Sequence, residues 1–98
     1  MVRLVKLTSS FLAQRAACGV IRPSRATTAL GRAIAALSRA ELLPEPGDAT
    51  TLLDPDDARG VAALVYVRRV RGQNLWIWYR DPGTAVELVA LTNQPPGP

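Results

Sequence analysis

The sequence contains no histidine and a single cysteine, Cys18, in 98 residues. Histidine is the usual acid–base group near neutral pH, so mechanisms built on it, such as the Ser-His-Asp triad, are excluded. Zinc and iron–sulfur sites need several cysteine or histidine ligands, which this composition does not supply. A lone cysteine cannot form an internal disulfide, which argues against a small secreted scaffold. We therefore expect neither a metal ion nor a cofactor.

Long hydrophobic runs are also missing from the sequence. The longest segments without a charged residue contain proline, glycine or polar side chains and are too short to cross a bilayer, so we expect no membrane partner. The composition is 48% hydrophobic and 20% charged, which is typical of a folded globular chain. A chain of 98 residues builds one hydrophobic core. We predict a single cytoplasmic domain over residues 1–98, in which residues 92–98 form a flexible proline-rich tail.

Acidic residues are absent from the first 40 positions, which carry seven basic residues. Six acids and no base follow in residues 41–57, and the rest of the chain is again rich in arginine. The net charge is +4, and eleven of the twelve basic residues are arginine. Arginine suits bidentate recognition of phosphate, although a GC-rich genome gives the same bias through codon usage. The net charge favours a nucleic acid or an acidic protein as partner.

The N-terminal half is predicted to form a strand and two helices. Residues 2–7 are apolar and partly β-branched, which indicates a strand. Thr8 and the serines after it can cap a short helix that ends at Gly19. Ser24 can cap a second helix, which is predicted to run to about Leu42.

The second helix is amphipathic. Its apolar side carries Leu30, Ile34 and Leu37, and its opposite side carries Arg25, Arg32 and Arg39. We interpret this arginine stripe as the solvated back of the helix. The acidic segment 44–57 contains proline and glycine and has no hydrophobic periodicity, so we predict a loop there.

The C-terminal half is predicted to form three strands, at about 60–70, 74–80 and 84–91. Gly72 suits the first turn because glycine adopts positive φ without strain, and Pro82-Gly83 suits the second. Two tight turns make the strands antiparallel neighbours. The predicted fold class is α+β, with the N-terminal strand and two helices packed on one face of a small antiparallel sheet.

The short turns fix a strand register, and the register sorts the side chains between two faces. It places Tyr66 opposite Tyr79 and Arg68 opposite Ile77, with Ile77 beside Leu88 on the last strand. The predicted core face consists of Leu64, Tyr66, Val70, Leu75, Ile77, Tyr79, Val86 and Leu88. Arg68 falls on this face as well, so we expect its side chain to reach past the edge of the sheet. The other, mixed face consists of Val65, Val67, Arg69, Trp76, Trp78, Arg80, Glu87 and Val89.

The mixed face has two interpretations. Tryptophans two residues apart on a strand are often buried against a helix or loop. Burial of Arg69 and Arg80 beside them would be costly without partners, which favours a contact surface instead. Tryptophan and arginine are enriched at protein interfaces, and both also suit nucleic acid, where they stack on bases or bind phosphate.

Three segments of the C-terminal half carry a family resemblance. They read Val65-Tyr66-Val67-Arg68-Arg69-Val70-Arg71-Gly72, then Leu75-Trp76-Ile77-Trp78-Tyr79-Arg80, then Val86-Glu87-Leu88-Val89-Ala90-Leu91. With the order of strand, two helices and antiparallel meander, they resemble the RelE/ParE toxin superfamily. The resemblance implies a toxin of a two-gene toxin–antitoxin module, neutralised by its antitoxin. RelE-type members cleave messenger RNA in the ribosome, and ParE-type members act on DNA gyrase.

The same resemblance implies site residues by position. Arg68, Arg69 and Arg71 match the basic strand end of the family. Tyr79 and Arg80 match the Tyr-Arg pair that ends the family's next strand. The implied catalytic residues, if the protein is an endoribonuclease, are Arg69, Tyr79 and Arg80. The implied nucleic-acid or partner-binding residues are Arg68, Arg69, Arg71, Trp76, Trp78 and Arg80.

The tail departs from the ribonuclease members. After Leu91 it has none of the tyrosine, histidine, lysine or arginine residues that those members place there. Arginine stays protonated and is a poor general base, so a non-catalytic inhibitor stays open beside the ribonuclease. Two alternatives from other classes are a small basic nucleic-acid-binding module without toxin activity and a subunit whose tryptophan face contacts a larger assembly.

Overall fold

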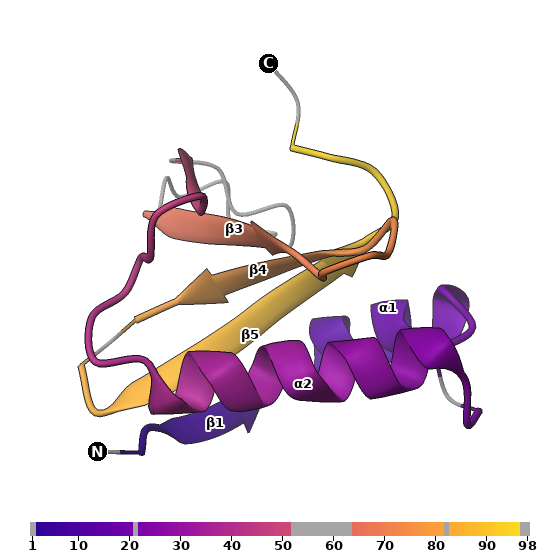
Figure 1. Cartoon of the computed structure of the whole chain (residues 1–98), viewed down its shortest axis with the longest axis horizontal. Coiled ribbons are helices and arrows are strands. Elements are labelled where there is room, and N and C mark those ends of the chain that lie inside the picture. Colours follow the sequence, from indigo (N-terminus) through magenta and orange to yellow (C-terminus); the bar gives the residue numbers. More distant parts are fainter. Residues whose placement is uncertain (1, 21, 52–63, 82, 97–98) are drawn as a thin grey trace.

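The computed structural model describes residues 2–20, 22–51, 64–81 and 83–96. In this part of the chain the elements are β1 (Leu4–Leu7), α1 (Ser9–Ala17), α2 (Arg25–Arg39), β2 (Ala49–Thr51), β3 (Val65–Arg69), β4 (Trp76–Arg80) and β5 (Ala85–Thr92). The strands form one sheet in the order β1-β5-β4-β3-β2, and both helices lie on the same face of it (Figure 1). The predicted α+β class is confirmed.

The sheet is mixed rather than antiparallel. β1 runs parallel to β5, whereas β2, β3, β4 and β5 are joined by antiparallel pairings. Two parallel neighbours need a crossover connection between them, and the chain from β1 to the meander supplies one in the form of α1 and α2. The prediction is therefore corrected at β1, which is an edge strand of the sheet rather than packed on its face, and which makes the sheet mixed rather than antiparallel.

Both helices begin where the sequence predicts. The Thr8 side chain accepts a hydrogen bond from the backbone N–H of Phe11, and the Ser24 side chain accepts one from Thr27. The second helix is shorter than predicted, because α2 ends at Arg39 rather than near Leu42.

Arg3 explains the earlier end of α2. Its side chain donates hydrogen bonds to the carbonyl oxygens of Ala40 and Glu41, at 3.3 and 3.0 Å. Its backbone N–H donates to the carbonyl of Ser38 at 2.6 Å. Arg3 thus holds the chain directly after α2, where the backbone of Ala40 is extended (ψ 133°) rather than helical.

A short strand lies within the segment that was predicted to be a loop. β2 pairs with β3 at one edge of the sheet, so the prediction of a loop over residues 44–57 is wrong at residues 49–51. Three residues are too few to show the alternation by which a strand is identified in a sequence. Residues 52–57 of that segment lie outside the described residues, as do residues 60–63 of the next predicted strand.

The two hairpin registers differ in how well they were predicted. Between β3 and β4, Tyr66 lies opposite Tyr79, as predicted. Between β4 and β5, Ile77 lies opposite Leu91 rather than beside Leu88, and the register shifts between Trp78 and Tyr79. The shift is a bulge that adds one residue to β5.

Glycine supports both turns. Gly72 and Gly83 have φ values of 76° and 110°, which other residues rarely adopt. The predicted Pro82 lies outside the described residues. β5 extends to Thr92, the first residue of the predicted tail, and no strand or helix follows in residues 93–96.

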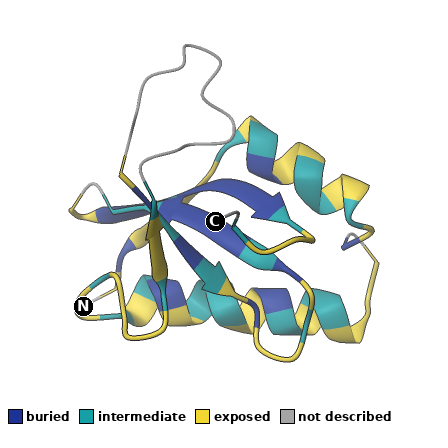
Figure 2. Ribbon diagram, turned by 90° about the horizontal axis from the view of Figure 1, so that it is seen from above, coloured by how far each residue is buried: buried dark blue, intermediate teal, exposed yellow. Residues whose placement is uncertain are grey.

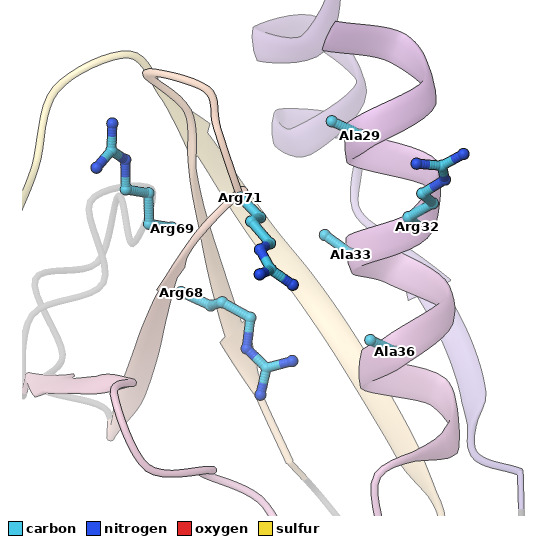
Figure 3. Close-up of a pocket in the computed structure, with 7 residues that line it drawn as sticks. All are labelled: Ala29, Arg32, Ala33, Ala36, Arg68, Arg69 and Arg71. Carbon is cyan, nitrogen blue, oxygen red and sulfur yellow. The ribbon is translucent and has the colours of Figure 1, made fainter. Parts of the chain in front are cut away.

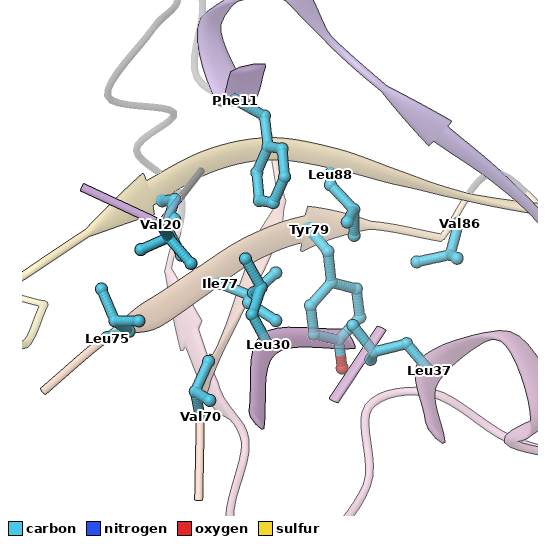
Figure 4. Close-up of a cluster of buried hydrophobic side chains, with 11 residues drawn as sticks. Phe11, Val20, Leu30, Leu37, Val70, Leu75, Ile77, Tyr79, Val86 and Leu88 are labelled. Atoms are coloured by element: carbon cyan, nitrogen blue, oxygen red, sulfur yellow. The ribbon is translucent and has the colours of Figure 1, made fainter. Parts of the chain in front are cut away.

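The main core lies between the helices and the sheet (Figure 4). Its buried members are Phe11, Val20, Leu30, Leu37, Val70, Leu75, Ile77, Tyr79, Val86, Leu88 and Leu91. A second buried cluster lies on the opposite face and consists of Val65, Val67, Trp78, Val89 and Ala90. Buried residues are accordingly concentrated along the strands (Figure 2). The predicted division between two faces is confirmed, except that Leu64 is exposed.

Neither α1 nor α2 is long and apolar enough to span a membrane, and they are the helices of the part of the chain that the structure describes.

Candidate functional site

The end of β3 places three arginines close together with their side chains on different sides. Arg68 lies on the helix side of the sheet, and Arg69 lies on the other side, because side chains alternate along a strand. Arg71 follows in the turn and is exposed. In Figure 3 the side chains of Arg68 and Arg71 lie between the strand and α2, whereas that of Arg69 points away from the helix.

Arg68 is held by two carboxylates. Its guanidinium donates to both oxygens of Asp48, at 2.9 Å each, and to Oε1 of Glu45 at 2.6 Å. The exposed fraction is 14% for the Arg68 side chain and 4% for that of Asp48. The expectation that Arg68 reaches past the sheet edge is therefore wrong. Arg68 instead forms a bidentate ion pair with Asp48, in the loop that precedes β2.

Tyr79 joins the same cluster from β4. Its ring is fully buried and tilted against that of Tyr66, with 5.5 Å between the centroids. Its hydroxyl donates a hydrogen bond to Oδ2 of Asp48. Burial raises the pKa of Tyr79, and the hydrogen bond and negative charge of Asp48 raise it further. Tyr79 therefore keeps its proton at neutral pH, which gives no support to a role in proton transfer.

Asp48 is ionised in this cluster. Burial acts to raise the pKa of its carboxyl, but hydrogen bonds from Arg68, Tyr79 and the backbone of Glu45 outweigh burial and hold the pKa below its usual value. For Arg68, burial acts to lower the pKa, and the hydrogen bond to Asp48 reverses this and raises it. The cluster is thus a charged pair with a neutral phenol.

A groove lies between α2 and the end of β3. Its volume is about 430 Å³, and it is lined by Ala29, Arg32, Ala33, Ala36, Arg68, Arg69 and Arg71 (Figure 3). It forms because α2 packs on β1 and β5, which leaves the side of the sheet near β3 without a helix. The three alanines point from α2 toward the strand, so the helix presents small side chains to the groove.

Arg32 and Arg71 carry the free charge of this groove. Both are exposed, and neither has a hydrogen-bond or ion-pair partner among residues 2–20, 22–51, 64–81 and 83–96. The interpretation of Arg32 as part of a solvated helix back is therefore incomplete, because Arg32 also lines the groove. The sequence signal that could have indicated this is the alanine spacing 29, 33 and 36, which marks one side of α2 as open to close approach.

The charged and aromatic side chains of the mixed face contact one another and neighbouring residues more than the sequence indicates. Arg69 donates to the carbonyl of Gln73 at 2.9 Å, and its guanidinium lies 5.5 Å from the ring centroid of Trp76. Arg80 pairs with Glu87 at 3.4 Å. Trp78 is only 9% exposed and donates its indole N–H to Thr92 at 3.0 Å. The face brings these residues together as predicted, but it buries Trp78.

No group of three or more metal-ligating side chains gathers within the residues that the structure describes. Comparisons of the chain with protein-family models, with curated proteins and with solved structures found no match.

Proposed function

We propose that this protein is a growth-inhibiting toxin of the RelE/ParE type, located in the cytoplasm and neutralised by an antitoxin. The observation that supports the proposal is the order of the elements, with one strand, a layer of two helices, and the antiparallel strands β3, β4 and β5. β3 ends in Arg68-Arg69 and β4 ends in Tyr79-Arg80, as the resemblance implies for this family.

Its target is either messenger RNA in the ribosome or DNA gyrase. The charges of the groove support inhibition by binding rather than by RNA cleavage. Among the residues that the structure describes, every ionisable side chain in the groove lining is arginine, which binds anions but does not accept a proton. Tyr79 is buried with a raised pKa, so it does not supply the missing base.

Expression of the full chain from an inducible promoter in a bacterial host tests the proposal. We expect growth to stop after induction, with intact messenger RNA by primer extension. A change in plasmid supercoiling would identify gyrase as the target, and inhibited protein synthesis would identify the ribosome. Cleaved messenger RNA would support a RelE-like toxin and contradict inhibition by binding alone. Growth at the rate of the uninduced culture, with the protein present at a normal level, would overturn the proposal.

A further inference from the structure

The groove is the middle one of three hollows in a row. A second hollow, of about 420 Å³, is lined by Ser24, Arg25, Thr28, Ala29 and Arg32 and shares Ala29 and Arg32 with the groove. A third, of about 380 Å³, is lined by Glu45, Pro46, Gly47, Asp48, Arg68 and Arg69 and shares the two arginines. Arg25, Arg32, Arg71 and Arg68 therefore follow one continuous path, which we name the arginine track.

The charge of the arginine track is only partly balanced within the protein. Arg68 is paired with Asp48 and Glu45. Arg25, Arg32 and Arg71 are exposed, and none of them has an ion-pair partner in the described part of the chain. Uncompensated charges of one sign along a concave surface attract an anionic occupant.

The shape of the arginine track indicates an extended occupant. Arg25 and Arg32 lie two helical turns apart on α2, a separation of about 10 Å, which exceeds the span of a single phosphate. The alanine side of α2 allows a chain to approach the helix closely. No aromatic side chain lines any of the three hollows in the described part of the chain, so the track offers no platform there on which a base could stack.

We propose that the arginine track binds the phosphodiester backbone of a single-stranded nucleic acid, without recognition of its bases. Phosphate contacts from arginine provide affinity and carry no sequence information. Glu45 is 46% exposed at the end of the track, so a phosphate can replace it on Arg68 while Asp48 stays in place. The inference does not rest on the toxin activity, because binding can occur without growth inhibition.

Fluorescence anisotropy with the purified full chain tests this inference. The probes are labelled DNA and RNA single strands of about 12 nucleotides and unrelated sequence, a length within the range of known single-strand sites. We expect all probes to bind with similar affinity. The double variant Arg32→Gln/Arg71→Gln should lose about tenfold in affinity at low salt, and the slope of log K against log salt should become shallower by about 1.4. The variant Arg22→Gln/Arg39→Gln removes the same charge outside the groove and should stay within about twofold of wild type.

Circular dichroism and thermal unfolding establish that each variant is folded before its affinity is interpreted. Unchanged binding by the groove variant would overturn the inference, as would an equal loss in both variants, which indicates a general charge effect. Poly-glutamate that competes as well as the oligonucleotides would assign the track to an acidic protein instead. Strong differences among probe sequences would contradict backbone recognition. Binding without growth arrest would refute the toxin proposal alone, and arrest without binding would refute this inference alone.

Discussion

Asp48 accepts a hydrogen bond from the hydroxyl of Tyr79, and this bond connects the loop before β2 to β4, the central strand of the sheet. The same carboxylate oxygen accepts hydrogen bonds from Arg68 at 2.9 Å and from the backbone N–H of Glu45 at 3.1 Å. Three donors therefore meet at one buried oxygen. This arrangement lets the core face of the sheet accommodate Arg68, a residue that the strand pattern places there at a high desolvation cost.

Replacement of Asp48 should change the acid stability of the protein. The lowered pKa of Asp48 stabilises the fold at pH values above its ordinary pKa of 3.8, and this contribution is lost as the pH falls through the folded-state pKa. Asp48→Asn should destabilise the fold by about 3 kcal/mol or more at neutral pH, because Arg68 keeps its charge without its main partner. Urea unfolding at several pH values measures this, and the difference from wild type should shrink below about pH 4. A difference independent of pH would contradict the ion pair.

Tyr79 should resist ionisation in the folded state. Its raised pKa means that the folded protein is stabilised below the ordinary pKa of 10.0, and that this contribution is lost as the pH rises above that value. The variant Tyr66→Phe leaves Tyr79 as the only tyrosine. We expect its phenolate absorbance to appear together with the loss of circular dichroism in an alkaline titration. Phenolate formation near pH 10 in a protein that is still folded would show that Tyr79 is accessible.

Leu37 should be essential for the packing of α2 on the sheet. Its side chain is fully buried in the main core. Leu37→Ala should therefore lower the free energy of unfolding by about 2–5 kcal/mol, through lost burial and the cavity that remains. Leu12 on α1 is 39% exposed, so Leu12→Ala is a matched control that should have a smaller effect. Equal effects of the two substitutions, measured by thermal or urea unfolding, would show that Leu37 is not a core residue.

The strands and helices that the sequence predicts are those whose signals are local. Ser24 as a cap and the alternation along β3 and β4 depend on neighbouring residues only, so these elements and their shared register could be predicted. The bulge in β5 and the short β2 depend on pairing with distant strands, which no local pattern reveals. The ion pair of Arg68 with Asp48 joins residues 20 positions apart, so the sequence could show the excess charge on the core face but not its partner.

In the candidate site, too, only the local features could be predicted. The clustering of Arg68, Arg69 and Arg71 follows from their adjacency and was evident in the sequence. The contribution of Arg32 depends on where α2 crosses the sheet, and that crossing is set by packing between layers. The groove could therefore not be predicted from helix periodicity alone.

Arg3 should contribute strongly to the stability of the fold. It is 8% exposed and donates to the carbonyl of Gly83 at 2.8 Å and to Asp81 at 3.2 Å, in addition to its bonds near the end of α2. Arg3→Gln should destabilise the fold by about 3–5 kcal/mol, because it removes the ion-pair partner of Asp81 and leaves several carbonyls without the donor that Arg3 supplies. The exposed Arg39 provides the control, since Arg39→Gln should cost less than about 1 kcal/mol. Similar stability of the two variants in urea would contradict this role.

Removal of charge from the mixed face should show which face of the sheet binds oligonucleotides. Both arginines of this face already have partners. Arg69 contacts Gln73 and Trp76, and Arg80 pairs with Glu87. The double variant Arg69→Gln/Arg80→Gln should stay folded, because partly exposed pairs contribute about 1 kcal/mol or less. It removes as much charge as Arg32→Gln/Arg71→Gln, but Arg80 lines none of the three hollows, and the guanidinium of Arg69 points away from α2 and is held by Gln73 and Trp76. Its oligonucleotide affinity should therefore fall much less in the same anisotropy assay. If it loses more affinity than the groove variant, the binding surface is the mixed face, as the tryptophan and arginine pattern of the sequence first suggested.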